Sequence, residues 1–147
     1  MLRTALLLIV VSLCAARVRA AEVTLVLDGL ESEGGDVQVD LFAESNAANF
    51  PYAERGVLFE IKCDARALRA AGAAIPLGDL APGRYALFAM HDENANGDLD
   101  RNFLGIPTER YGFSNGARGT VGPPSFDAAA VQIGGDAPSR IVVHLGR

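Results

Sequence analysis

The sequence predicts an all-β protein, an antiparallel β-sandwich of about seven short strands with one long loop after a central strand. Segments in which apolar and polar residues alternate recur along the chain, and turn-rich segments separate them. The alternation of strands and helices that is typical of a parallel sheet is missing. Residues 84–91 are apolar on both faces, which indicates a strand in the middle of a sheet.

The first twenty residues have the pattern of a secretory leader. Arg3 supplies the positive charge, and residues 5–13 form an apolar run that is too short to span a bilayer. Val18, Arg19 and Ala20 resemble a signal-peptidase site, so we expect cleavage after Ala20. The alternative is an uncleaved anchor. The prediction is a signal peptide at 1–20, a single domain at 21–147, and a periplasmic or secreted location.

The charge of the mature chain narrows the class of partner. Arg3, Arg17 and Arg19 leave with the leader, so ten basic residues face 18 acidic ones and the formal net charge becomes −8. This balance argues against nucleic acid and against an anionic membrane surface, and it favours cations. No membrane span is expected in the mature chain.

Cys63 is the only thiol expected after the leader, which carries Cys14, is removed. A single cysteine cannot form an internal disulfide. It alternates with Val57, Phe59 and Ile61, which predicts a buried side chain that packs as a small hydrophobe. The alternative is a reactive thiol or an intermolecular disulfide.

The remaining elements follow from periodicity and turn residues. Residues 64–71 favour a short helix, capped by Asp64 and ended by Gly72, with a turn as the alternative. In the second predicted strand, Gln38 and Asp40 form the polar side opposite an apolar face. The predicted strands are 22–27, 37–41, 57–63, 75–77, 84–91, 128–133 and 139–145.

The stretch after the central strand has the spacing of a calcium loop. Oxygen-bearing side chains stand at loop positions one, three, five and nine, and Gly97 at position six allows the sharp turn. A further residue at position seven would contribute its backbone carbonyl. The predicted metal ligands are Asp92, Asn94, Asn96, Asp98 and Asp100.

Position twelve departs from the EF-hand pattern, because Phe103 stands where a bidentate Glu is expected. We therefore expect calcium to bind weakly, with Asp100 ligating directly and Glu109 as a candidate for the missing ligand. The alternative is a tight turn that binds nothing, since Asp, Asn and Gly also favour such turns.

The long loop is rich in aromatic residues. Loops beyond about 12–15 residues are uncommon in compact domains and are usually functional or disordered. Two arrangements are open: a packed cap over one end of the sandwich, or a binding surface. The residues concerned are Phe103, Leu104, Ile106, Tyr111, Phe113 and Phe126.

No catalytic residues are predicted. Ser114 does not sit in a nucleophile elbow. His91 and Asp92 are neighbours along a strand and should point to opposite faces, so we do not expect them to pair with each other in a catalytic triad with Ser114. Gly116, Gly119 and Gly122 do not follow a strand, and their spacing is no dinucleotide fingerprint.

Four segments together resemble a known family. They are NFPYAERG, LAPGRYALFAMHDENANGDLDRNFLGIPTERYGFSN, GPPSFDAAAV and IVVHL. They resemble an uncharacterised bacterial exported family, the domain of unknown function 2141. The resemblance implies an exported β-sandwich of immunoglobulin-like or transthyretin-like type, and it implies no catalytic residues. The loop is also similar to that of surface-protein B-type domains that bind calcium, from which Phe103 departs.

Two functions follow as hypotheses. The first is an exported non-enzymatic domain in which calcium orders the aromatic-bearing loop for binding or assembly with a protein or carbohydrate partner. The second is a small periplasmic or secreted enzyme that uses the same loop as a metal-assisted active site, which requires an open metal position and a nearby base.

Overall fold

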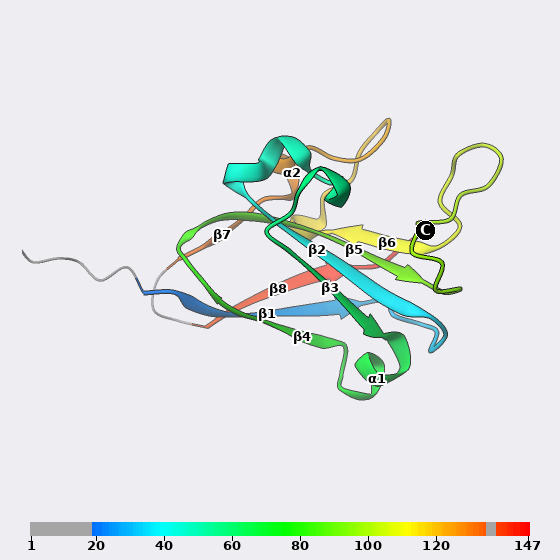
Figure 1. Ribbon diagram of the computed structural model, residues 1–147, viewed down its shortest axis with the longest axis horizontal. Coiled ribbons are helices and arrows are strands. Elements are labelled where there is room, and N and C mark those ends of the chain that lie inside the picture. The colour runs from blue at the N-terminus through cyan, green and yellow to red at the C-terminus, as the bar shows by residue number, and fades with distance from the viewer. Residues whose placement is uncertain (1–18, 135–137) are drawn as a thin grey trace, which may run out of the picture.

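The computed structural model describes residues 19–134 and 138–147, which form two β-sheets packed face to face (Figure 1). The smaller sheet has the strand order β4-β1-β8, and the larger has the order β3-β2-β5-β6, with β7 also paired to β5. The strands are β1 (Ala21–Asp28), β2 (Asp36–Ala43), β3 (Phe59–Asp64), β4 (Ala74–Leu80), β5 (Gly83–Asp92), β6 (Arg110–Phe113), β7 (Val131–Ile133) and β8 (Ser139–His144). The predicted all-β sandwich is confirmed, with eight strands in the described part rather than about seven.

The pairing is antiparallel throughout the described strands except between β1 and β8, which run parallel. Leu25 lies opposite Ile141 in this pair, and Leu27 lies opposite Val143. The first and last strands are therefore neighbours. The predicted leader, residues 1–20, falls almost wholly outside the described residues, and β1 begins at Ala21.

The main core lies between the sheets and comes from the predicted alternation. Val37, Val39 and Leu41 point inward from β2 and are fully buried. They meet the inward side chains of β1, Val23, Leu25 and Leu27. Each such side chain contributes about 1.5–3 kcal/mol when it leaves water, so this alternating pattern supplies much of the driving force for folding.

A second apolar cluster covers the outer face of the larger sheet. Phe50 lies at its centre, with ring centroids 5.2 Å from Phe42, 5.7 Å from Phe113 and 6.1 Å from Phe126. The 3₁₀ helix η1 (Glu44–Asn49) and the helix α2 (Phe126–Ala129) lie on this side (Figure 1). Because both faces of the sheet are covered, β5 is buried on both sides, and the predicted central strand is confirmed.

The predicted helix at 64–71 is confirmed as α1 (Ala65–Ala70). The Asp64 carboxylate accepts a hydrogen bond from the backbone N–H of Ala67 at 2.8 Å, which satisfies one of the free donors of the first turn. Gly72 follows the helix with φ +79°, a conformation that glycine adopts without steric cost.

The predicted strand at 128–133 was wrong in its first half. Ser125 caps a single helical turn by accepting a hydrogen bond from the backbone N–H of Ala128 at 3.2 Å, and strand β7 starts only at Val131. A serine followed by Phe, Asp and three alanines allows a helical turn as readily as a strand. The burial of Phe126 beneath this turn favours the helix.

The long loop also contains a strand that the periodicity did not indicate. Residues Arg110–Phe113 form β6, in which Tyr111 lies opposite Met90 and Gly112 lies opposite Ala89. A glycine inside so short a segment weakens the strand signal, since glycine has no side chain to pack. The segment forms a strand because it pairs with β5.

Cys63 lies on the inner side of β3, half-buried, with its thiol 3.8 Å from the backbone carbonyl oxygen of Val37. Burial raises the pKa of this thiol, and the charges of Asp36 and Asp64 raise it further. The predicted alternation is confirmed for Phe59 and Ile61, although all three side chains are half-buried rather than buried. It was wrong for Val57, which precedes β3 and packs against the outer cluster.

Labelling of Cys63 by an alkylating reagent at pH 8 should be at least about tenfold slower in the folded protein than in denaturant, because only the thiolate reacts. The folded-state rate should go on rising with pH where the rate of the unfolded chain has levelled off. Mass spectrometry of timed samples measures both rates. Equal rates would show that the thiol is open to solvent and that its pKa is not raised.

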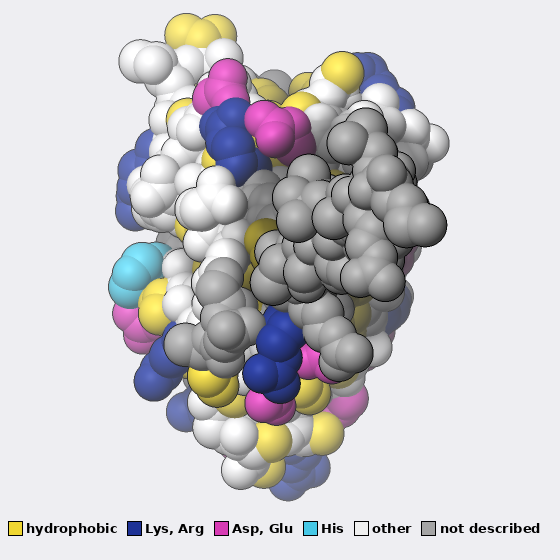
Figure 2. Space-filling view, turned by 90° about the vertical axis from the view of Figure 1, so that its left-hand side faces the viewer, with side chains coloured by type: hydrophobic (Ala, Val, Ile, Leu, Met, Phe, Trp, Pro, Cys, Tyr) yellow, Lys and Arg dark blue, Asp and Glu magenta, His cyan; other side chains and the backbone are white. Residues whose placement is uncertain are grey.

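The surface carries mixed charge at the end of the sandwich away from the loop between β5 and β6. Figure 2 shows acidic, basic and hydrophobic side chains interspersed on the coloured surface there. Arg84, for example, bridges Glu44 and Asp127 at 2.8 and 2.6 Å.

No helix within the described residues is long and apolar enough to cross a membrane.

Candidate metal centre

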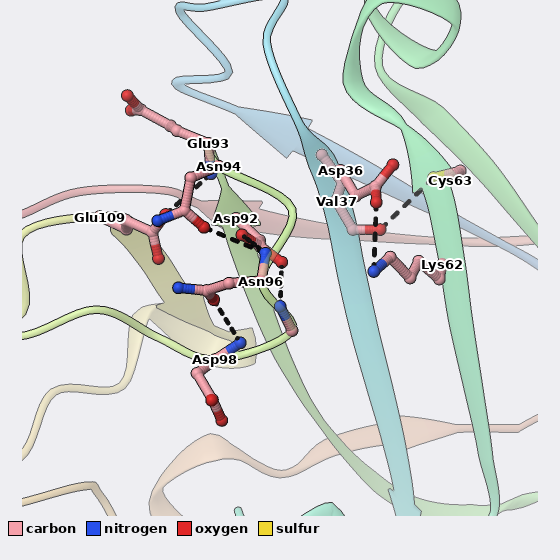
Figure 3. Close-up of polar contacts among 11 residues, drawn as sticks. Asp36, Val37, Lys62, Cys63, Asp92, Glu93, Asn94, Asn96, Asp98 and Glu109 are labelled. Carbon is pink, nitrogen blue, oxygen red and sulfur yellow. Dashed lines mark hydrogen bonds and ion pairs between the residues drawn. The ribbon is translucent and has the colours of Figure 1, made fainter.

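The candidate loop begins at the last residue of the central strand. Asp92 ends β5 with its side chain only 1% exposed. Its two carboxylate oxygens accept hydrogen bonds from the backbone N–H groups of Asn96 at 3.0 Å and Gly97 at 2.7 Å (Figure 3). The chain can turn back this sharply because Ala95 and Gly97 adopt positive φ angles of 58° and 90°. Asp92 therefore holds the loop closed from inside.

Three of the other predicted ligands converge on one point. The side-chain amide of Asn94 donates to one carboxylate oxygen of Asp100 at 2.7 Å, and that of Asn96 donates to the other at 3.0 Å. The amide oxygens accept backbone hydrogen bonds, Asn94 from Asn96 at 3.0 Å and Asn96 from Asp98 at 2.8 Å. The alternating positions read from the sequence thus meet in space.

Asp98 is the exception among the predicted side chains. It is exposed, and its carboxylate points away from the other loop side chains (Figure 3). The sequence assigned it a backbone role, so a side chain turned outward agrees with that assignment. Its backbone carbonyl as a ligand stays a prediction.

Glu109 joins the two ends of the loop. It precedes β6 and is only 5% exposed. One carboxylate oxygen accepts from the backbone N–H of Glu93 at 2.8 Å, and the other accepts from that of Asp100 at 3.0 Å. The sequence singled it out as a possible missing ligand, and the fold does bring it to the loop. Both of its oxygens are engaged with backbone donors there.

The donor set suits a hard cation with oxygen ligands. Rotating the two amides of Asn94 and Asn96 by 180° would present their oxygens, rather than their NH₂ groups, toward Asp100. The loop is also strongly acidic, since Glu93, Asp98 and Glu109 accompany its two central aspartates. Among residues 19–134 and 138–147, no three His, Cys, Asp or Glu side chains lie close enough together to hold a metal. The candidate set differs from such a group because two of its members are amides.

The remaining loop forms an exposed hairpin beside the candidate site. A bridge between Arg101 and Pro107 closes it, and the Asn102 carboxamide oxygen accepts from the backbone N–H groups of Leu104 and Ile106 at 2.9 and 3.1 Å. The side chains at its tip are apolar and point to solvent. Phe103, with 93% of its surface exposed, is the extreme case.

The apolar residues of the long loop fall into two groups, one buried and one exposed. Phe113 and Phe126 are buried in the outer cluster, and Tyr111 packs against it, so this part is a cap. The cap covers the face of the larger sheet rather than one end of the sandwich. Phe103, Leu104 and Ile106 remain outside it and are exposed.

Ser114 and His91 have structural partners. The buried Ser114 hydroxyl donates to the carbonyl oxygen of Ala129 at 2.6 Å and accepts from the backbone N–H of Leu87 at 2.9 Å. The His91 Nε2 lies 2.7 Å from the carbonyl oxygen of Gly34, where it donates, and the ring is fully buried. His91 Nδ1 is left without a hydrogen-bond partner in the described part of the chain. Ser114 thus ties together β5 and the segment before β7.

A feature that the sequence did not reveal is a cleft of about 910 Å³ on the outer face of the larger sheet. Its floor includes Gln38, Asp40, Phe88 and Met90. The expectation that Gln38 and Asp40 form a solvated side of β2 was wrong for Asp40, which is only 2% exposed. The signal was Phe42, an aromatic residue on the same face, which indicates that something covers this side.

These features define a small β-sandwich domain with a candidate cation-binding loop where its central strand ends. Residues 25–141 match DUF2141, a family of uncharacterised proteins conserved in bacteria, and the chain belongs to this family. The family resemblance inferred from the sequence is thereby confirmed. No curated protein and no solved structure showed significant similarity to the chain.

Proposed function

We propose that this protein is an exported, non-enzymatic domain in which bound calcium orders the hairpin after β5 and so presents a surface for a protein or carbohydrate partner. The proposed ligands are the side chains of Asp92, Asn94, Asn96 and Asp100 with the backbone carbonyl of Asp98. The observation that carries the proposal is the convergence of Asn94 and Asn96 on the carboxylate of Asp100.

A bound cation would stabilise the loop by reducing the repulsion between its acidic side chains. Asp92 and Asp100 lie at opposite ends of a nine-residue turn, with Asp98 between them. Closing that turn brings like charges together, which costs free energy that a divalent cation would offset. Without a cation the two amide groups supply part of that compensation by donating to Asp100.

Weak binding follows from the ligand count. Phe103 offers no carboxylate at the twelfth position, so the proposed site lacks the bidentate ligand of an EF-hand. We expect a dissociation constant on the order of 10⁻⁴–10⁻³ M, as in extracellular calcium modules. Such an affinity suits a compartment outside the cytoplasm.

The hairpin tip supplies the proposed surface. Phe103, Leu104 and Ile106 follow the last ligand within six residues and are all exposed. Exposed apolar residues that cluster in this way are typical of interaction sites. Calcium at Asp100 would fix the start of the hairpin, because the Asp100 carbonyl accepts from the backbone N–H of Thr108 at 2.8 Å.

Calcium at tenfold excess over its dissociation constant should raise the free energy of unfolding by about 1.4 kcal/mol. This corresponds to a rise of about 4–8 °C in the unfolding temperature for a domain of this size. Thermal unfolding with millimolar calcium and with chelator measures the effect, and amide hydrogen exchange should place it between Asp92 and Glu109.

Two variants sharpen the calcium test. Asp100→Asn removes one proposed charge and should abolish most of the stabilisation, whereas Glu22→Gln removes the same charge from β1 and should leave it intact. Glu22 is exposed on the smaller sheet. If calcium leaves the native protein unchanged, the loop is a turn that binds no calcium. A full response in Asp100→Asn would place the metal elsewhere.

Export has its own measurement. The Arg3, apolar-run and Ala20 pattern predicts that protein recovered from the native cell starts at Ala21. Intact-mass spectrometry of periplasmic and culture-supernatant fractions should give the mass of residues 21–147. A full-length chain in the soluble cytoplasm would contradict the proposed location.

A further inference from the structure

The cleft on the outer face of the larger sheet has a defined floor and walls. The pairing register places Phe88 between Asp40 on β2 and Phe113 on β6, and Met90 between Gln38 and Tyr111. Side chains on one face of neighbouring strands that lie opposite each other are in contact range. The floor is therefore an apolar strip with a polar margin on the β2 side.

Three loops stand around this floor. The segment 51–54, which carries Tyr52 and Glu54, lines the cleft on one side. The hairpin 97–107 and the glycine-rich loop 116–123 line the others, and both project from the sandwich in Figure 1. The result is an open pocket with a volume in the range of small-molecule sites.

Asp40 is the buried acidic residue of this cleft. Its carboxyl is 2% exposed and lines the cleft. Among the described residues it accepts one hydrogen bond, a long contact of 3.3 Å from the Gln38 side-chain amide. None of the ion pairs found within residues 19–134 and 138–147 includes Asp40. Buried carboxylates are normally paired with a cation, and the described part of the chain supplies none for this one.

The negative charges near Asp40 raise the free-energy cost of ionising its carboxyl group. Burial raises the pKa of Asp40, the Gln38 hydrogen bond lowers it, and the negative charges of Glu60 and Glu54 raise it, which together bring it to about 6. Glu60 lies directly opposite Asp40 on β3. Lys62, two residues further along that strand, pairs with Asp36 at 3.1 Å instead. This corner of the cleft therefore combines negative charge with an apolar surface.

We propose that this cleft binds a small organic cation, an amine with an apolar body, whose ammonium group pairs with Asp40 while its body lies over Phe88 and Met90. An ammonium would supply the missing countercharge. The rings of Phe88 and Tyr111 offer faces that attract cations as well as apolar groups. The proposal does not depend on calcium binding by the neighbouring loop.

The basic residues of the cleft do not take the place of this cation. The Arg147 guanidinium pairs with Glu93 at 3.1 Å, and that of Arg101 donates to the carbonyl oxygen of Gly105 at 3.1 Å. Arg118 lies on the exposed loop 116–123, and the His144 ring pairs with Asp28 at 2.8 Å. These basic residues, together with Asp98, line the walls of the cleft, whereas Asp40 lies on its floor. An anionic ligand would meet Asp40, Glu54 and Glu60, so a cation fits this corner better.

Met90 provides a direct probe of the floor, because the only other methionine is Met1. Benzylammonium added to ¹³C-methyl-methionine-labelled protein in chelator at pH 7.5 should shift the Met90 methyl resonance with a saturable, millimolar dissociation constant. Benzyl alcohol, which has a similar shape and no charge, should bind at least about tenfold more weakly, since hydrogen bonds to charged groups are the stronger ones.

Asp40→Asn should weaken benzylammonium about tenfold and leave benzyl alcohol unchanged. This variant keeps the size of the side chain and should fold, because the raised pKa of Asp40 shows that the neutral form already suits the site. Glu22→Gln on β1 removes the same charge outside the cleft and should change neither affinity by more than about twofold.

The native protein gives a second readout through pH. Asp40 must lose its proton to pair with a cation, so benzylammonium affinity should fall as pH drops through about 6, and the benzyl alcohol affinity should not. Binding equal to that of benzyl alcohol would identify a neutral apolar ligand and overturn the proposal. So would full affinity in Asp40→Asn, or no saturable shift of Met90.

Discussion

Replacing Gly112 by alanine should lower the free energy of unfolding by about 3 kcal/mol or more, because there is no room for a side chain where the two sheets meet. A Cβ atom at Gly112 would lie 2.2 Å from the carbonyl oxygen of His144 and 3.0 Å from Cγ1 of Val143. Backbone hydrogen bonds between Tyr111 and Gly146, at 3.0 and 2.9 Å, hold β6 and the end of the chain together at this point.

Gly146→Ala is the matched control for Gly112→Ala. It lies on the facing segment, and a Cβ atom there meets nothing within 4 Å. We expect it to change stability by less than about 1 kcal/mol. Urea denaturation followed by circular dichroism measures both variants. If Gly112→Ala proved as mild as its control, β6 and β8 would have to separate at little cost, and the contact would not be a constraint on the fold.

The sandwich was predictable because alternation with a period of two reports directly on a half-buried strand. Val37, Val39 and Leu41 point inward as that pattern requires. The pattern describes one face at a time, however. The second layer over the outer face arises from the 3₁₀ turns after β2 and from α2, which bring Phe50 and Phe126 onto the sheet from distant positions. No local period encodes this contact.

The loop residues were predictable for a similar reason, since their spacing alone places side chains on one side of a tight turn. Asp92, Asn94, Asn96 and Asp100 do lie together. Asp40 was hidden, because its burial depends on loops that are far away in the sequence. A polar residue on a strand is exposed or buried according to what covers the sheet, and the local signal for such a cover was the aromatic Phe42 on the same face.

The loop should lose its order when Glu109 is removed. Glu109→Ala leaves the backbone N–H groups of Glu93 and Asp100 without their acceptor, and each buried donor without a partner costs about 1–3 kcal/mol. We expect a loss of about 3 kcal/mol in the free energy of unfolding. The backbone amides of Glu93 and Asp100 should exchange with solvent much faster, while amides in β1 and β8 keep the protection set by global unfolding.

Glu93→Ala provides the control for this position. Glu93 is an acidic residue of the same loop whose side chain pairs with Arg147 at the surface, at 3.1 Å, and exposed pairs of this kind contribute about 0–1 kcal/mol. Its substitution should leave the exchange of the Asp100 amide nearly unchanged. Glu109→Gln should fall between the two, because it keeps one acceptor oxygen and turns an NH₂ group toward the other donor. If Glu109→Ala matched Glu93→Ala, the loop would be held by Asp92 alone.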